Sequence, residues 1–226
     1  MEEIKARITE IFYSIQGEGI YVGYPQIFVR FSGCNLENCR FCDTPDSEYQ
    51  EMSIQELITA IVSVNGNYHS ISLTGGEPLL QVDFLERFLE HFNTNHRIYL
   101  ETNGTLPANL ERIVSNVDII AMDIKLPSAT GLAPYWEDHR RFLLIAWEKT
   151  VFVKTVITKA TEDKDLQQAV ELILSVDPNI PLVLQPATEE LDEELFRKLL
   201  DYQQEASKSL FDVRIIPQIQ RLISIK

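Results

Sequence analysis

The stretch Ser32-Gly33-Cys34-Asn35-Leu36-Glu37-Asn38-Cys39-Arg40-Phe41-Cys42-Asp43-Thr44 holds all three cysteines of the 226-residue chain. A disulfide framework would need an even number of cysteines spread along the chain, whereas a compact trio is typical of a metal site. Thiolates are the usual ligands of iron–sulfur clusters, and one tight loop can present three of them to three irons of a cube. The fourth iron is then open to a substrate or cofactor. We therefore predict that Cys34, Cys39 and Cys42 bind a [4Fe-4S] cluster.

Zinc is the alternative metal for this loop. A structural zinc site usually takes four protein ligands, but the chain has no fourth cysteine, and its four histidines are remote from the loop in sequence. A catalytic zinc on three cysteines stays open as an alternative, and so does a non-enzymatic, zinc-stabilised binding module. Metal analysis would separate these, because zinc without iron or sulfide would favour the binding module.

The rest of the chain alternates short apolar runs rich in β-branched residues with amphipathic segments. Strands are predicted at 26–31, 70–74, 97–101, 118–123, 152–158, 181–185 and 212–216, and helices near 53–64, 81–92, 106–113, 135–147, 163–176 and 190–204. Such alternation predicts a parallel sheet covered by helices. Six or seven units do not close an eight-stranded barrel, and no G-x-G-x-x-G follows the first strand as in a Rossmann sheet. We predict an α/β fold, a partial (open) TIM-like (β/α)6 barrel, as one domain over 1–226.

Polar and glycine-rich motifs follow the predicted strands at their carboxyl ends. They are Thr74-Gly75-Gly76-Glu77-Pro78, Glu101-Thr102-Asn103-Gly104, Asp123 with Lys125, Lys154 within the fifth strand, and Gln185-Pro186. The active sites of barrel enzymes form at this end of the strands. We therefore expect an active site there.

The composition limits the partners. The formal net charge is −14, which disfavours nucleic acid as a direct partner because its phosphates would be repelled. No apolar stretch is long enough to span a bilayer, and the start Met1-Glu2-Glu3 lacks the basic and apolar run of a secretory signal. We expect a cytoplasmic protein without a membrane partner.

A cysteine trio after the first strand and a Gly-Gly-Glu-Pro turn after the second resemble the radical S-adenosylmethionine (SAM) superfamily. Four residues separate the first two cysteines here, one more than in the usual C-x-x-x-C-x-x-C spacing. Departures of this kind occur in the 7-carboxy-7-deazaguanine synthase family. The loop Gln16-Gly17-Glu18-Gly19 and the tail Pro217-Gln218 also resemble that family.

The resemblance implies a set of SAM contacts. Gly75, Gly76 and Glu77 would hold the methionyl amino end, although a capped helix start is the alternative role for this turn. The remaining SAM contacts implied are Glu101, Asp123, Ile124, Lys125, Gln185 and Pro186. Asp123 stands where the family has a serine.

The resemblance also implies how a pterin substrate binds, with a substrate loop at about 12–19 and a cluster loop at 34–44. The substrate residues implied are Ile15, Gln16, Gly17, Glu18, Arg30, Thr74, Gln220 and Lys226. Arg30 would clamp the substrate carboxylate, with an internal ion pair as the alternative role. Gln220 takes the place of a family histidine, and Thr44 would bind Mg²⁺ unless it only caps a turn.

The implied reaction converts 6-carboxy-5,6,7,8-tetrahydropterin to 7-carboxy-7-deazaguanine with loss of ammonia. SAM would be cleaved to a radical and then regenerated, with electrons from a flavodoxin or ferredoxin, and the protein is expected to be a homodimer. The alternative enzyme is a radical SAM activase for a glycyl-radical enzyme, whose site would have to admit a peptide loop.

Overall fold

A computed structural model of the chain describes residues 4–36, 39–40, 48–92 and 95–223. Within these residues, nine strands form one sheet in the order β3-β1-β2-β4-β5-β6-β7-β8-β9. The strands are β1 (Lys5–Ile15), β2 (Pro25–Phe31), β3 (Gln50–Ser53), β4 (Ser70–Gly75), β5 (Arg97–Thr102), β6 (Ile119–Asp123), β7 (Thr150–Ile157), β8 (Leu182–Pro186) and β9 (Val213–Ile215). The strands from β2 to β9 in this order are parallel, and β1 is antiparallel to both β2 and β3.

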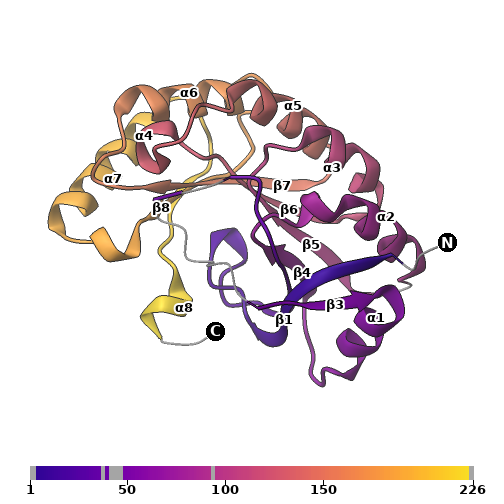
Figure 1. Cartoon of the computed structure of the whole chain (residues 1–226). Coiled ribbons are helices and arrows are strands. Elements are labelled where there is room, and N and C mark those ends of the chain that lie inside the picture. Colours follow the sequence, from indigo (N-terminus) through magenta and orange to yellow (C-terminus); the bar gives the residue numbers. More distant parts are fainter. Residues whose placement is uncertain (1–3, 37–38, 41–47, 93–94, 224–226) are drawn as a thin grey trace.

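Most of the helices connect parallel strands and cover one side of the sheet. They are α1 (Ile54–Ser63), α2 (Val82–His91), α3 (Pro107–Ile113), α4 (Pro127–Thr130), α5 (Trp136–Ala146), α6 (Asp163–Leu174), α7 (Glu193–Ala206) and α8 (Ile219–Leu222). Figure 1 shows α2 to α7 along the convex side of the curved sheet, whereas α8 lies on the concave side. The sheet is not closed, because β3 and β9 are its two edges. The predicted open (β/α)6 barrel is confirmed, with β9 added after the sixth strand–helix unit.

The antiparallel strand β1 was not predicted, and it includes the first part of the expected substrate loop. Residues 12–15 belong to β1, so that loop begins only at Gln16. The pairing of β1 with β2 shifts register between Ile8 and Glu10. Such a bulge interrupts the two-residue alternation by which a half-buried strand is recognised in a sequence.

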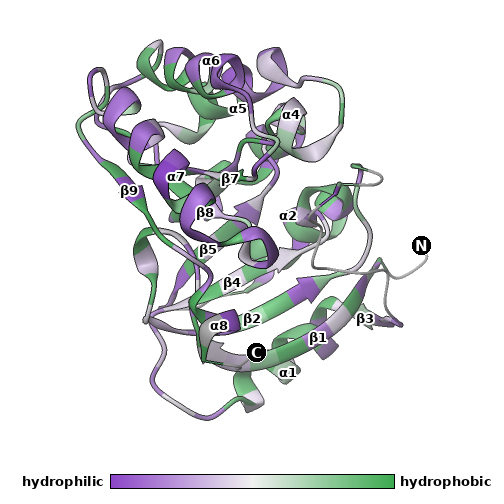
Figure 2. Cartoon of the chain, turned by 90° about the vertical axis from the view of Figure 1, so that its left-hand side faces the viewer, coloured by the Kyte–Doolittle hydropathy of each residue, from purple (hydrophilic) through white to green (hydrophobic). Residues whose placement is uncertain are grey.

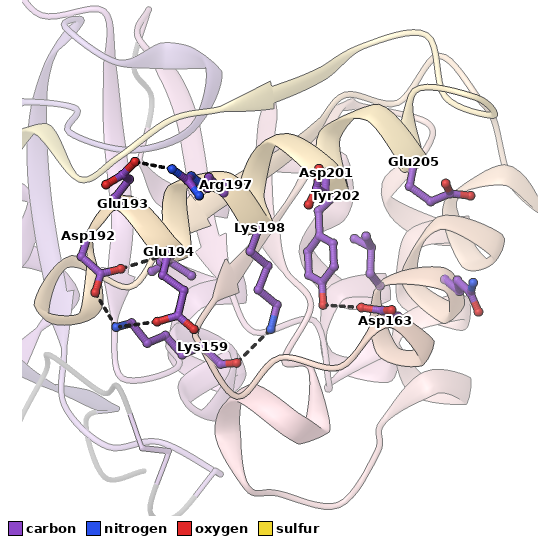
Figure 3. Close-up of a pocket in the computed structure, with 13 residues that line it drawn as sticks. Lys159, Asp163, Asp192, Glu193, Glu194, Arg197, Lys198, Asp201, Tyr202 and Glu205 are labelled. Atoms are coloured by element: carbon purple, nitrogen blue, oxygen red, sulfur yellow. Dashed lines mark hydrogen bonds and ion pairs between the residues drawn. The ribbon is translucent and has the colours of Figure 1, made fainter.

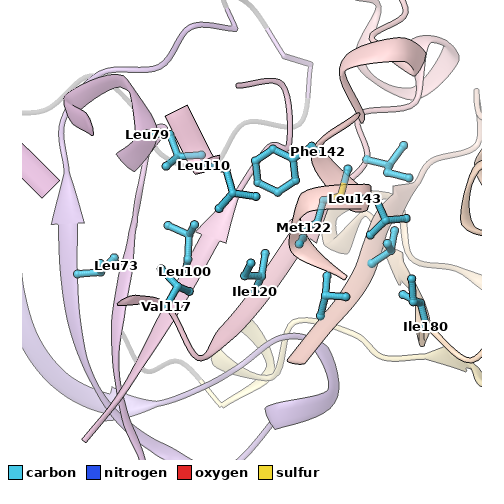
Figure 4. Packing of buried hydrophobic residues seen from close by; sticks show 14 of the residues in the cluster. Leu73, Leu79, Leu100, Leu110, Val117, Ile120, Met122, Phe142, Leu143 and Ile180 are labelled. Atoms are coloured by element: carbon cyan, nitrogen blue, oxygen red, sulfur yellow. The ribbon is translucent and has the colours of Figure 1, made fainter. Parts of the chain in front are cut away.

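The convex face of the sheet packs against the helices through one large apolar core. Leu73, Leu100 and Ile120 from neighbouring strands lie beside Leu110 and Phe142 from α3 and α5 (Figure 4), and all five are fully buried. Burying each such side chain contributes about 1.5–3 kcal/mol. Figure 2 shows β2 as hydrophobic along most of its length and α7 with hydrophilic stretches, as expected for a covered strand and a surface helix.

The concave face has two layers. Tyr99, Phe152 and Val183 belong to a small apolar cluster, against which Ile20 and Tyr21 of the 3-10 helix η1 (Gly19–Tyr21) pack. Two residues further along β5, β7 and β8, the side chains are polar: Glu101, Lys154 and Gln185. The apolar cluster is thus a floor beneath a polar layer at the carboxyl ends of the strands. No helix among the described residues is long and apolar enough to cross a membrane.

Candidate active site

A cavity of about 390 Å³ lies above the polar layer, at the carboxyl ends of the parallel strands. It brings together nearly all the predicted site residues that the structure describes. They are Ile15, Gln16, Gly17, Glu18, Arg30, Cys34, Cys39, Thr74, Gly75, Gly76, Glu101, Asp123, Lys125, Gln185, Pro186 and Gln220. Glu77 and Ile124 are buried and do not line the cavity. Cys42, Thr44 and Lys226 lie outside the described residues.

Two of the three predicted cluster ligands border this cavity. Cys34 is exposed and Cys39 is partly buried. The Cys34 sulfur accepts hydrogen bonds from the Leu36 backbone N–H at 3.4 Å and from Asn103 Nδ2 at 3.9 Å. Donors aimed at a sulfur stabilise its thiolate form, which is the form that binds iron. The described part of the loop therefore suits an iron–sulfur cluster at the cavity wall.

The Gly75-Gly76 turn packs directly against the residues that precede Cys34. A Cβ atom on Gly76 would lie 2.1 Å from the carbonyl oxygen of Gly33, and Gly75 has a φ of +131°. The Glu77 N–H donates to the same Gly33 carbonyl at 2.8 Å. Glycine is required here by close approach and by backbone conformation. The turn thus fixes the base of the cluster loop as well as lining the cavity.

The Glu77 carboxylate points away from the cavity. It accepts hydrogen bonds from the backbone N–H groups of Leu79 at 3.0 Å and Asn103 at 2.7 Å, and from Thr102 Oγ1 at 2.9 Å. Burial raises its pKa to about 7, although these donors and Lys125 act in the opposite direction. The alternative role of this turn, a capped helix start, is therefore present, and Glu77 also joins it to the end of β5.

Glu101, predicted as a SAM contact, lies among residues predicted for the substrate. Its carboxylate accepts hydrogen bonds from Gln16 Nε2 at 2.8 Å and Thr74 Oγ1 at 3.0 Å. The Gln16 side-chain oxygen in turn accepts from the Glu18 backbone N–H at 3.0 Å. Glu101 therefore fixes the loop 16–19 against β4 and β5.

A buried chain of charges crosses the cavity wall. Lys154 Nζ forms an ion pair with Glu18 and lies 3.6 Å from Asp123 Oδ2, which Lys125 Nζ approaches to 2.9 Å. Burial alone would raise the pKa of Glu18, but Lys154 and hydrogen bonds from Gln218 and Gln220 lower it to about 2.

The pKa of the Lys154 ammonium is likewise set by burial acting against neighbouring charges. Burial alone would lower its pKa, but Glu18, Asp123 and Glu101 raise it well above the usual range. Glu18 and Lys154 are therefore both charged at neutral pH.

Arg30 forms an internal ion pair and also borders the cavity. Its Nε donates to Glu10 Oε1 at 2.8 Å, and its guanidinium lies 5.8 Å from the centre of the Phe12 ring. The ion pair that we held as the alternative is thus present. The side chain keeps about 27% exposure and borders the cavity, so it also faces any ligand there.

Three buried oxygen atoms of the cavity residues have no hydrogen-bond partner within the described residues: Asp123 Oδ1, Gln185 Oε1 and Gln220 Oε1. An unsatisfied buried acceptor costs roughly 1–3 kcal/mol. A ligand rich in hydroxyl and amino donors would satisfy them, as the ribose and amine of SAM or the N–H groups of a pterin could. The residues present therefore fit both predicted small molecules.

A second, larger hollow lies between α6 and α7 (Figure 3), with a volume of about 980 Å³. Its charges are paired at the surface, as in the contact of Lys159 with Asp192, whose side chains are 40% and 49% exposed. It is lined mainly by residues of α6 and α7 and shares no lining residue with the cavity above the polar layer. Exposed ion pairs of this kind are ordinary surface features, so the smaller cavity is the candidate site.

Sequence reasoning noted Lys154 and Asn103 at the strand ends but gave them no role. Lys154 interrupts the apolar run of β7, and a buried lysine needs an acidic partner. Asn103 follows Glu101 at the end of β5, where its side chain reaches Cys34. The role of Gln218, which donates to Glu18 Oε1 at 2.7 Å, had no sequence signal beyond its place in the tail.

Comparison with known proteins identifies the family. The model of the radical SAM superfamily matches residues 28–142. The chain is 39% identical to the 7-carboxy-7-deazaguanine synthase of Geobacter sulfurreducens and 36% identical to that of Methanothermobacter thermautotrophicus, in each case over 99% of both chains. The chain belongs to the 7-carboxy-7-deazaguanine synthase family. This membership decides against both the glycyl-radical activase and the zinc-stabilised binding module.

Solved structures agree with this family at the level of the fold. QueE from Escherichia coli matches with a TM-score of 0.61 and 21% identity, over 95% of this chain and 94% of that one. Streptococcus suis SuiB bound to SAM matches with a TM-score of 0.51 and 15% identity, over 80% of this chain and 44% of that one. The fold of this chain is thus shared with both of these proteins.

Proposed function

We propose that the chain is a radical SAM lyase that converts 6-carboxy-5,6,7,8-tetrahydropterin to 7-carboxy-7-deazaguanine with release of ammonia, in the biosynthesis of 7-deazapurines such as queuosine precursors. One observation carries this proposal. A single cavity collects two cluster cysteines, the Gly75-Gly76 turn and the loop 16–18, in a chain that matches synthases of this name from end to end. The continuous sheet from β3 to β9 supports one catalytic domain over 1–226.

Cys34, Cys39 and Cys42 would bind the [4Fe-4S] cluster. When bound, the reduced cluster and SAM supply the radical that removes a hydrogen atom from the pterin. The backbone at Gly75 and Gly76 would lie against the methionyl part of SAM. Asp123 Oδ1 and Gln185 Oε1, both buried acceptors, would take hydrogen bonds from its hydroxyl or amino groups. Lys125 and Pro186 would complete that side, and Ile124 would support it from beneath. Glu77 acts beneath it by holding Asn103 and Thr102.

The opposite side of the cavity would bind the pterin. Gln16 and Glu18 offer an amide and an ionised carboxylate to the edge of the ring, and Thr74 and Glu101 adjoin them. Arg30 would pair with the substrate carboxylate. Gln220 touches Glu18 at 3.0 Å, and its oxygen would meet any Cβ on Gly17 at 1.8 Å, so α8 closes directly over the loop. Ile15 would pack on the ring, and Lys226 would complete the set of substrate contacts. The protein thus contributes orientation and shielding from water.

Four further features belong to the proposal. A Mg²⁺ ion would bind to Thr44. The reason for this proposal is the Asp43-Thr44 pair after the last cysteine, which offers the oxygen ligands that Mg²⁺ prefers. A flavodoxin or ferredoxin would reduce the cluster. A cytoplasmic location suits cysteines that must stay reduced. A homodimer would cover exposed apolar side chains such as Phe196 and Phe211, which are 48% and 79% exposed.

The test is an anaerobic assay of reconstituted protein with reductant, SAM, Mg²⁺ and 6-carboxytetrahydropterin. Mass spectrometry should detect 7-carboxy-7-deazaguanine, and omission of Mg²⁺ should lower the rate. Cleavage of SAM without this product, in protein with full iron content, would contradict the assigned substrate. Absence of iron from folded, reconstituted protein would contradict the cluster.

A further inference from the structure

We infer that Lys154 is a positioning residue, whose buried ammonium holds the Glu18 carboxylate of the substrate loop and joins it to Asp123 at the end of β6. The inference rests on the proposed function only for the identity of the two ligands. The contacts themselves belong to this chain.

The geometry places one cation between two segments that are distant in sequence. Lys154 stands in β7 directly above Phe152 of the apolar floor, and its side chain is only 11% exposed. Glu18 and Asp123 are 15% and 10% exposed. The loop 16–18 would contact the pterin and Asp123 would contact SAM, so Lys154 bridges the two sides of the cavity.

Lys154 lies at the centre of a group of charged side chains. Three carboxylates, Glu18, Asp123 and Glu101, act on Lys154, and Lys125 is the second buried ammonium beside Asp123. Three further cations border the cavity: Arg30 from β2, which pairs with Glu10, Arg40, and Arg221 from α8. Glu189 and Glu190 add two carboxylates at its border. Tyr99 of β5 faces Glu18 as a neutral phenol, because burial raises its pKa.

Loss of the Lys154 ammonium would affect Glu18 more than Asp123 or Glu101. Asp123 would keep Lys125 at 2.9 Å, and Glu101 would keep hydrogen bonds from Gln16, Ser72 and Thr74. Among the side chains that the structure describes, Glu18 would keep hydrogen bonds from the neutral amides of Gln218 and Gln220. A buried carboxylate with neutral partners takes up a proton, because burial then outweighs its hydrogen bonds.

Protonation of Glu18 would remove an acceptor from the pterin side. In the native protein Glu18 is ionised throughout the neutral range, so pterin affinity should not change with pH through this group. In Lys154→Met, affinity should instead be weak at low pH and recover as the pH rises and Glu18 ionises. A purely structural lysine would weaken binding without this dependence on pH.

The binding test compares Lys154→Met with Lys154→Arg, which keeps the charge, and with Lys159→Met, which removes an exposed lysine just beyond the same strand. Calorimetry of the anaerobically reconstituted proteins gives the Kd of 6-carboxytetrahydropterin and of SAM at pH 6, 7 and 8.5. We expect Lys154→Met to weaken pterin binding by about tenfold or more at pH 6, as for one unit of pKa shift, and less at pH 8.5. The Kd of SAM should change by less than about threefold, and Lys159→Met should match the native protein. Equal, pH-independent loss of both ligands would overturn the inference, as would unchanged pterin binding.

A second measurement does not depend on the substrate. Infrared spectroscopy at pH 7 should show a protonated carboxyl band in Lys154→Met in addition to any band from Glu77, which has a pKa of about 7 in the native protein as well. The additional band should be absent from the native protein and from Lys154→Met/Glu18→Gln. If Lys154→Met does not fold, Lys154→Gln serves in its place. Absence of the additional band would overturn the role of Lys154. Failure of the native protein to bind 6-carboxytetrahydropterin, with the additional band present in the variant, would instead contradict the proposed function and leave Lys154 supported.

Discussion

The two faces of the sheet differ by one residue along each strand. Leu73, Leu100 and Val153 face the helices, and the next residues, Thr74, Glu101 and Lys154, line the cavity. The convex face is apolar and contributes stability, whereas the upper concave face is polar and its groups hold one another in place. Because side chains alternate along a strand, one segment can serve stability and chemistry separately. Substitutions on the convex face should therefore lower the free energy of unfolding, and substitutions on the upper concave face should lower ligand binding or activity.

The largest effect is expected from Cys34→Ala on the cavity side. Loss of one of three cluster ligands should abolish product formation and lower bound iron and sulfide, while the exposed position of Cys34 leaves the apolar core intact. Metal analysis and thermal unfolding of the variant reconstituted beside the native protein check both points. Full iron content with normal activity would contradict the assignment of Cys34 as a cluster ligand on the concave side.

Leu100→Ala should produce the reverse pattern. Leu100 is fully buried on the convex face, so truncation leaves a cavity and should lower the free energy of unfolding by about 2–5 kcal/mol. Iron content and the Kd of SAM should stay near the native values in the protein that remains folded. Urea unfolding measures the loss, and Leu200→Ala, at a position that is 46% exposed on α7, is the matched control. Similar losses in the two variants would contradict the assignment of the core.

Glu77→Gln tests the buried carboxylate that joins the Gly75-Gly76 turn to the end of β5. Its pKa is about 7 in the folded protein against 4.5 for the free side chain, so the folded state binds this proton more tightly. The stabilisation is therefore complete below about pH 4.5 and is lost as the pH rises through 7, by an amount on the order of 1–3 kcal/mol. Urea unfolding at pH 5, 6 and 7.5 should show this decline in the native protein and a flatter profile in the variant. An equal decline in both would show that another group is responsible.

The smallest effect is expected in the groove between α6 and α7. Lys159 pairs there with Asp192 and lies 3.4 Å from Glu194, but all three side chains are well exposed. Water and salt screen such pairs, so Lys159→Ala should change the free energy of unfolding by less than about 1 kcal/mol and leave product formation unchanged. Denaturant unfolding with and without added salt measures this. A loss of activity would give the groove a role that its exposed charges do not suggest.

The sequence predicted the convex face better than the concave one. Runs such as Ile119–Asp123 and Leu182–Pro186 are apolar enough to mark buried parallel strands, and the motifs at their ends marked the cavity. The strand β1 was not predicted because its bulge interrupts the alternation of apolar and polar residues. Within the cavity, the residue types were predictable, but their partners were not. The contacts of Lys154 with Glu18 and of Glu101 with Gln16 join segments 136 and 85 positions apart, and no local pattern encodes such a pairing.

The most direct test of the account is an anaerobic crystal structure of the reconstituted protein with SAM and 6-carboxytetrahydropterin. The account predicts both molecules in the cavity above Glu101 and Lys154, with SAM against Gly75, Gly76 and Asp123 and the pterin between the loop 16–18 and Arg30. Either molecule in the groove between α6 and α7, or a pterin that does not touch Gln16 and Glu18, would contradict the assignment of the concave face as the active site.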